Sequence, residues 1–182
     1  EDGVLEPISP YGAGKLAGES YVRQLSRYYG FESVVLRYFN TYGPGQTLTP
    51  YVGVITIFIN SLLEGRPPMV FGTGSQVRDF VYVGDVAEAN MLAMTSSVDG
   101  TVVNVGSGRG TSVNDIASLL ISRFGPGIEA LRAPLPLGEP RDSVADITRA
   151  RNLLGFNPCT RVEYAINEVI DSVKKGRLAA PA

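Results

Sequence analysis

Tyr11 and Lys15 are the strongest candidates for acid–base chemistry in this 182-residue chain. Residues four positions apart share one face of a helix, with Cβ atoms about 5–6 Å apart. An ammonium group beside a phenol favours the phenolate and lowers the phenol pKa from its usual value of about 10. The pair therefore predicts a general base that works near neutral pH. The alternative is a chance pair on a solvated helix face.

The composition narrows the chemistry that remains possible. The chain has no histidine and one cysteine, Cys159, which excludes histidine-dependent nucleophilic sites and thiolate zinc clusters, so we expect no metal. A net charge of −2 leaves no basic excess for binding nucleic acid. The longest apolar stretch, residues 52–63, is too short and too polar to cross a membrane. No signal peptide is visible, so we expect a cytoplasmic protein.

A helix must position the tyrosine and lysine. Ser9 is a good N-cap, Pro10 fits the first helical position, and Gly30 is expected to end the helix. Gly14 and Gly18 lie on the same face as the pair, and each costs about 1 kcal/mol relative to alanine. We therefore expect another body, either a neighbouring element or a cofactor, to approach this face closely.

Downstream, strands and helices alternate, which indicates α/β architecture. The patterns predict strands at residues 33–39, 69–71, 80–83, 102–105 and about 128–131. They predict helices at residues 54–64, 85–95, 112–124, 146–155 and about 160–175, with a turn-rich loop at 40–45. Asp85 with Glu88, and Thr160 with Glu163, read as capping boxes. Five short strands are few for a self-sufficient doubly wound sheet, which suggests a missing part.

Five segments, in order, resemble the extended short-chain dehydrogenase/reductase family, and within it the nucleotide-sugar epimerases and dehydratases of the UDP-glucose 4-epimerase type. They are residues 7–19, 36–44, 76–85, 104–108 and 138–146. The resemblance implies the C-terminal part of a Rossmann-type fold with a smaller substrate-binding α/β domain. Residues 1–50 would be a remnant of the NAD-binding domain. Residues 51–182 would mainly bind substrate, with about 80–105 returning to the Rossmann sheet.

The activity implied is NAD-dependent oxidation of a sugar hydroxyl followed by return of the hydride, as in an epimerase acting on UDP-glucose or UDP-galactose. A dehydratase or decarboxylase of the same family is an alternative, and so is a truncated module that binds sugar nucleotides without turnover. In the family, the glycine-rich turn, the acidic residue that binds the adenine ribose and a catalytic Ser or Thr all precede the tyrosine. Only ten residues precede Tyr11 here, so we expect an incomplete NAD site and little activity from this chain alone.

The resemblance also implies roles for the residues nearest the reaction. Tyr11 would take the hydroxyl proton, and Lys15 would lower the pKa of Tyr11 and bind the nicotinamide ribose. Tyr38 and Phe39 would lie against the nicotinamide end of NAD, and Asn40 would contact the sugar nucleotide. The parent would be a homodimer formed through the first helix and the one before it.

Further residues would bind the nucleotide. Gly53 and Val54 would approach the base or phosphates through their backbone, and the segment from Met69 to Phe71 would line the uracil slot. Arg78 would neutralise the diphosphate, since a guanidinium offers a fork of donors. Taken singly, each residue has a plainer explanation as a turn cap, a core residue or a surface ion pair.

Two local departures bear on phosphate binding. Pro136 stands where the family usually has an arginine that holds the diphosphate or ribose, and Arg141 is close enough in sequence to substitute. The segment from Gly106 to Gly110 follows a strand and loosely matches a dinucleotide fingerprint. Thr111 stands where that fingerprint needs its third glycine, so we do not expect phosphate there.

Overall fold

The fold is described from a computed structural model, which covers residues 1–47, 49, 52–135 and 141–179. Its helices are α1 (Pro10–Tyr29), α2 (Val54–Leu63), α3 (Val83–Thr95), α4 (Val113–Phe124), α5 (Thr148–Leu154) and α6 (Val162–Ala179). Its strands are β1 (Val34–Tyr38), β2 (Asn40–Tyr42), β3 (Met69–Phe71), β4 (Val77–Tyr82), β5 (Thr101–Val105), β6 (Gly110–Ser112), β7 (Leu131–Ala133) and β8 (Asp142–Ser143). The α/β alternation predicted from the sequence is confirmed.

One stretch of chain belongs to two sheets. β1 pairs in parallel with β5, and beyond β1 the backbone N–H of Phe39 donates to the carbonyl oxygen of Val105 at 2.9 Å. The chain then enters β2, which pairs in parallel with β4 in a second sheet of order β2-β4-β6. β8 also pairs with β4, and β3 pairs with β7 in a third sheet. The segment from Tyr38 to Asn40 therefore lies at the junction of the first two sheets.

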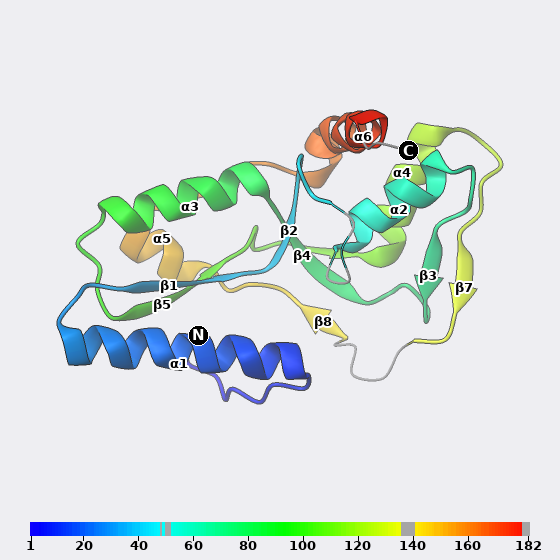
Figure 1. The fold of residues 1–182 in the computed structure, drawn as a ribbon. Helices are drawn as coiled ribbons and strands as arrows, with labels where there is room; N and C mark the ends of the chain where they lie inside the picture. The colour runs from blue at the N-terminus through cyan, green and yellow to red at the C-terminus, as the bar shows by residue number, and fades with distance from the viewer. Residues whose placement is uncertain (48, 50–51, 136–140, 180–182) are drawn as a thin grey trace.

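Two groups of buried side chains stabilise the described chain. In Figure 1, α3 and α5 lie on one side of the β1–β5 ladder and α1 lies on the other. The core beneath α3 and α5 includes Val81, Val103, Val105, Ala150 and Phe156. The second core is formed chiefly by α2, α4 and α6 and includes Phe58, Ile59, Ile116, Leu120 and Ile166.

The predicted signals at both ends of α1 are confirmed. Ser9 is the N-cap, and its side chain accepts a hydrogen bond from the backbone N–H of Gly12 at 3.1 Å. Pro10 occupies the first helical position. Gly30 ends the helix with a left-handed φ of 72°, a backbone conformation that glycine adopts at no steric cost.

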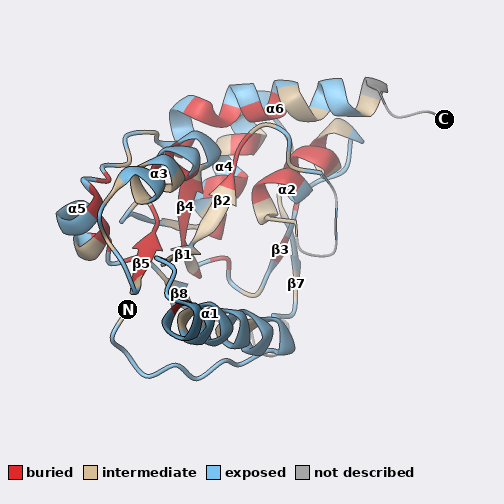
Figure 2. Cartoon of the chain, turned by 60° about the vertical axis from the view of Figure 1, so that its left-hand side comes forward, coloured by how far each residue is buried: buried red, intermediate tan, exposed pale blue. Residues whose placement is uncertain are grey.

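Despite these caps, α1 packs weakly on the rest of the molecule. Ser26 is its one buried residue, and Figure 2 shows the helix exposed along most of its surface. Its firmest polar contact joins it to β1, because Arg37 donates to both carboxylate oxygens of Glu19 at 2.8 Å each. Apart from the neighbouring residues and backbone of α1 itself, no atom of the described residues lies within 4 Å of a Cβ placed on Gly14 or Gly18. The close approach expected at these glycines therefore involves no described residue.

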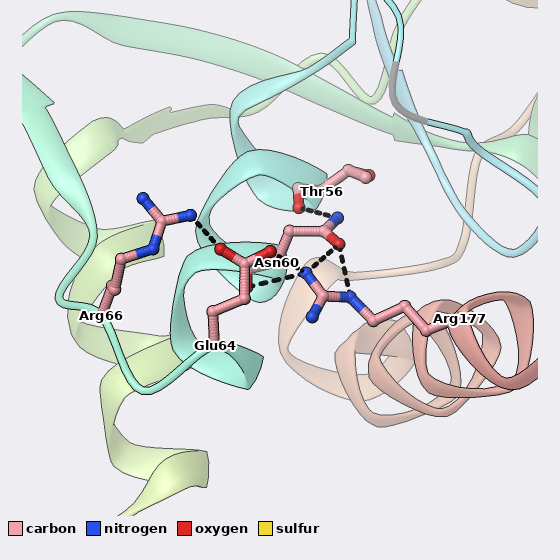
Figure 3. Close-up of polar contacts among 5 residues, drawn as sticks. All are labelled: Thr56, Asn60, Glu64, Arg66 and Arg177. Carbon is pink, nitrogen blue, oxygen red and sulfur yellow. Dashed lines mark hydrogen bonds and ion pairs between the residues drawn. The ribbon is translucent and has the colours of Figure 1, made fainter. Parts of the chain in front are cut away.

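A polar cluster joins α6 to α2 (Figure 3). Asn60 is buried on α2, and its Oδ1 accepts from Nε of Arg177 at 2.8 Å, while its Nδ2 donates to the carbonyl oxygen of Thr56 at 2.8 Å. Glu64 accepts a hydrogen bond from Arg177 at 2.7 Å and also pairs with Arg66. These contacts satisfy a buried amide and fix the orientation of α2, whose first turn enters the cleft described below.

Three short strands were not predicted. β2 lies in the segment expected to be a turn-rich loop, and β6 and β8 are likewise two or three residues long. The described part of the chain therefore has eight strands where five were expected. Strands this short carry too few residues to show an alternating pattern, and pairing with β4 is what makes them strands.

The capping box predicted at Asp85 is wrong. α3 begins two residues earlier, at Val83, and Asp85 is buried within its first turn. The Asp85 carboxylate instead accepts hydrogen bonds from the backbone N–H of Thr160 at 3.2 Å and from its hydroxyl at 3.3 Å. The side chain that was expected to cap α6 therefore ties the segment before α6 to α3.

Candidate nucleotide-sugar site

A cleft of about 860 Å³ opens where β2, β3 and the first turn of α2 meet, and we call it the main cleft. Nine of the eleven site residues predicted from the sequence line it, from five separate segments. They are Tyr11, Tyr38, Phe39, Asn40, Gly53, Val54, Met69, Phe71 and Arg78. A volume of this size is within the usual range for ligand sites, about 300–1,000 Å³.

Tyr11 and Lys15 lie at the edge of this cleft. Lys15 lines a second cleft of about 700 Å³ between α1 and β1, and Tyr11 lines both clefts. The Nζ of Lys15 is 5.2 Å from the centroid of the Tyr11 ring, within range of a cation–π contact. Tyr11 is 57% exposed. The structure thus brings the predicted pair together.

The wall near Tyr11 is the junction segment between the two sheets. It follows the carboxyl ends of the parallel strands β1 and β5, the place where open α/β sheets bind ligands. Tyr38 is half exposed, and its hydroxyl donates to Oδ1 of Asn90 at 2.8 Å, which fixes the ring. Phe39 and Asn40 follow directly and also line the main cleft. Three consecutive residues therefore contribute to the lining of a single space.

The opposite wall is apolar. β3 alternates, with Val70 fully buried in the core while Met69 is 37% and Phe71 44% exposed. Leu135, 44% exposed, also lines this wall. Large apolar side chains that remain exposed within a cleft are typical of a ligand site. Their arrangement suits a flat group such as a nucleotide base.

The first turn of α2 supplies backbone donors. Gly53 is the N-cap residue, and α2 has no side-chain cap among the described residues. The N–H groups at the start of a helix attract anions such as phosphate. Gln46 also lines the main cleft here, and its Oε1 accepts from the hydroxyl of Thr56 at 2.6 Å.

Arg78 brings a positive charge to the main cleft. It is 8% exposed, and its Nη1 donates to the carbonyl oxygens of Val77 at 2.9 Å and Arg141 at 3.2 Å. The Arg141 side chain is exposed and is not among the described residues that line the main cleft. The Pro136 position lies outside the described residues, so a phosphate-binding role for Arg141 stays a prediction.

The loop that loosely matches a dinucleotide fingerprint already holds a carboxylate. Asp79, fully buried, accepts from the backbone N–H of Ser107 at 2.7 Å and of Gly108 at 2.9 Å. It also accepts from the hydroxyl of Ser107 at 2.7 Å and the N–H of Ala145 at 3.1 Å. The donors that would bind a phosphate are satisfied from within the chain, which agrees with the expectation that this loop binds none.

Sequence reasoning missed two amides in the main cleft, Gln46 and Gln76. Gln76 is 8% exposed, and its Nε2 donates to the carbonyl oxygen of Phe71 at 2.9 Å. Strand periodicity could have found it, because Gln76, Arg78 and Phe80 alternate along the chain and all line the cleft.

Two other kinds of feature are absent from the described residues. They contain no group of three or more acidic, cysteine or histidine side chains placed to hold a metal ion. None of the helices in the described ranges is long and apolar enough to span a bilayer.

Comparison with known proteins places these features in a family. The model of the NAD dependent epimerase/dehydratase family matches residues 1–106. The chain is 39% identical over 174 residues to a putative UDP-glucose 4-epimerase of Methanocaldococcus jannaschii, a match that covers 96% of this chain and 56% of that relative.

Solved structures agree. The UDP-glucose 4-epimerase of Thermotoga maritima, solved with UDP-glucose, superposes with a TM-score of 0.88 at 40% identity, over 94% of this chain and 55% of that one. A UDP-glucuronic acid 4-epimerase of Bacillus cereus, solved with UDP-glucuronic acid and NAD, gives a TM-score of 0.88 at 32% identity, over 96% and 55%. The chain thus spans about half the length of the relatives it matches. On this sequence and structural similarity, the chain has a Rossmann-type α/β fold and belongs to the NAD dependent epimerase/dehydratase family.

Proposed function

We propose that this chain carries the substrate side of an NAD-dependent nucleotide-sugar epimerase of the UDP-glucose 4-epimerase type. The observation that supports this most is the gathering of nine predicted residues, from five segments, around one cleft with Tyr11 at its edge. The relatives named above, which include an epimerase solved with UDP-glucose, support the same substrate class. Since the chain spans about half of those relatives, the activity is proposed for the whole protein that carries it.

Tyr11 is proposed as the group that moves the proton. Its phenol oxygen would accept the proton of a sugar hydroxyl bound in the main cleft and later return it. The Lys15 ammonium, 5.2 Å from the ring centroid, would stabilise the negative charge that Tyr11 carries in between. Asn40 would orient the sugar from the wall of the same cleft.

The residues present fit the nicotinamide end of NAD. Tyr38 and Phe39 offer aromatic surface at the carboxyl end of β1, and Lys15 offers a charged donor to a ribose hydroxyl. When bound, NAD would supply reversible hydride acceptance. The protein would place these three side chains beside Tyr11. The proton would then leave the oxygen, and the hydride the carbon, of the same C–OH group of the sugar.

The remaining lining residues would hold the nucleotide. Met69 and Phe71 would cover the faces of the base, which removes apolar surface from water. The backbone of Gly53 and Val54, together with Arg78, would bind the diphosphate, since backbone donors and a guanidinium both favour phosphate oxygens.

We propose the organisation of the whole protein on the same basis. Residues 1–50 would belong to the NAD-binding domain and 51–182 mainly to the substrate domain, with about 80–105 in the Rossmann sheet. The partner would be a second copy in a cytoplasmic homodimer, for which the outer face of α1 offers Tyr21, Tyr28 and Tyr29, all at least 70% exposed.

The test uses the protein expressed from its complete reading frame. Adding UDP-glucose should produce UDP-galactose and a transient absorbance of reduced NAD. Tyr11→Phe should lower turnover by about 10²–10⁴-fold, because it removes the proton acceptor. The matched control is Tyr164→Phe on α6, an exposed tyrosine that lines neither cleft and should leave turnover unchanged. Full activity in Tyr11→Phe would refute the catalytic assignment. If the unsubstituted protein gives neither UDP-galactose nor the absorbance of reduced NAD, the epimerase proposal is refuted.

A further inference from the structure

A buried polar contact joins α6 to α2 within a mainly apolar interface. Asn60 is 8% exposed, and its Oδ1 accepts from Nε and Nη2 of Arg177 at 2.8 and 2.6 Å (Figure 3). Nη2 of Arg177 also donates to the backbone carbonyl oxygen of Asn60 at 3.0 Å. A polar pair in an apolar interface adds little stability but specifies one register, because a shift leaves the pair unmade. The contact therefore fixes where α2 lies along α6.

The same helix also holds the loop before α2. The backbone N–H of Gly45 donates to Oγ of Ser172 on α6 at 3.1 Å. The next residue, Gln46, lines the main cleft, and its Oε1 accepts from the hydroxyl of Thr56 at 2.6 Å. The carbonyl oxygen of Thr56 accepts from Nδ2 of Asn60 at 2.8 Å. A closed ring of hydrogen bonds thus runs from α6 through the loop to α2 and, through Asn60, back to α6.

This ring lies behind the part of the main cleft that is proposed to hold the diphosphate. Gln46, Gly53 and Val54 line the cleft there, and both amide atoms of Gln46 are 3.8 Å from a Cβ placed on Gly53. Ser172 and Arg177 are not among the described residues that line the cleft. They therefore act on a ligand through the loop and α2. Because N–H donors bind oxygen only at about 2.7–3.2 Å, a small displacement of α2 is enough to weaken such a bond.

Resting on the proposed function, we propose that Arg177 is a positioning residue for nucleotide binding. Through Asn60 it holds the first turn of α2, and with it the loop at Gln46, in the relative position that the diphosphate requires. The reacting groups Tyr11 and Lys15 come from α1, which takes no part in the ring. Arg177 thus sets the affinity for the nucleotide and leaves the chemical step unchanged.

The test combines kinetics and calorimetry on the protein expressed from its complete reading frame. In Arg177→Met, the KM for UDP-glucose and the Kd for UDP should each rise about tenfold, the worth of one hydrogen bond to a charged group, while kcat stays within about twofold. The matched control is Arg66→Met, which removes the other arginine that pairs with Glu64 and leaves Asn60 untouched. The control should keep KM, Kd and kcat within about twofold of the unsubstituted protein.

A second variant separates position from stability. Arg177→Met leaves Oδ1 of Asn60 without its donor, which lowers stability. The double variant Asn60→Leu with Arg177→Met replaces both partners by apolar side chains, a change that is nearly neutral for folding. Its Kd for UDP should still rise about tenfold, because α2 lacks the contact that fixes its register.

The possible results separate this proposal from the proposed function. An unchanged Kd for UDP in the double variant would overturn the positioning role. A fall in kcat as large as the rise in KM would also overturn it, since a general disturbance of the fold acts on both. If neither variant folds, Arg177 serves folding and the proposal is likewise overturned. Failure of the unsubstituted protein to bind UDP would instead refute the proposed function.

Discussion

The ion pair between Glu19 and Arg37 is predicted to hold the tyrosine–lysine helix in place. α1 has one buried residue, so apolar packing contributes little to its attachment. The pair is bidentate, with both N···O distances at 2.8 Å, and the side chains are 9% and 25% exposed. A hydrogen bond to a charged group contributes about 1.5–3 kcal/mol, and partial exposure places this pair at the lower end of that range. Arg37→Met should therefore cost about 2–3 kcal/mol, part of it from leaving the Glu19 charge unpaired.

Two measurements check this prediction. Urea denaturation of Arg37→Met, Glu19→Gln and the double variant should give a coupling free energy of about 1–2 kcal/mol. Hydrogen exchange should speed up about tenfold or more in α1 of the Arg37→Met protein, because each 1.4 kcal/mol of local stability is a factor of ten. Exchange in α4, within the other core, should change much less.

A matched control removes an exposed pair of the same chemistry. Arg66 pairs with Glu64 where the side chains are 69% and 39% exposed, so Arg66→Met should change stability by less than about 0.5 kcal/mol. A coupling free energy near zero for Glu19 and Arg37, or unchanged exchange in α1, would refute the assignment of the helix anchor to this pair.

Two further predictions concern buried polar groups. Tyr42→Phe removes a hydroxyl with no hydrogen-bond partner in the described ranges, so urea denaturation should show a gain of about 0.5–1 kcal/mol; a loss of stability would contradict this. Burial, followed by the charges of Asp85 and Glu163, raises the pKa of Tyr42. Stability should fall as the pH rises above about 10, where the unfolded chain loses this proton first, and the fall should be shallower in Tyr42→Phe. Asp79→Asn turns an amide NH₂ toward backbone donors and should cost about 2–4 kcal/mol by the same assay, whereas Ser107→Ala should cost about 1 kcal/mol; equal losses would show that the carboxylate is not the organising group.

Local signals predicted the elements whose ends are determined locally. Ser9 and Gly30 bound α1, and Ser112 with Asp115 forms the capping box that starts α4. Such signals fail where the side chain of the expected cap forms its hydrogen bonds with a residue distant in the sequence. Asp85 looks like a cap in sequence, yet Thr160, 75 positions away, supplies its hydrogen bonds.

The candidate site was predictable to the extent that its residues stand in a family pattern. That pattern named Asn40, Arg78 and Phe71, and all three line the main cleft. It included Gln76 in the segment 76–85 without giving it a role, because its contact is to the backbone of another strand. Any residue type can supply a backbone carbonyl, so the sequence does not reveal which residue the amide contacts. Only the folded chain shows that this amide is fixed and buried.

The junction at Phe39 has a mechanical consequence. One residue separates the strand that pairs with β5 from the strand that pairs with β4, so the link between the two sheets is very short there. Asn40 on one side of that link and Tyr38 on the other both line the main cleft. A ligand that contacts both would resist any rotation of one sheet against the other. Occupancy of the cleft would thus be transmitted to both cores at once, and the two would tend to melt as one cooperative unit.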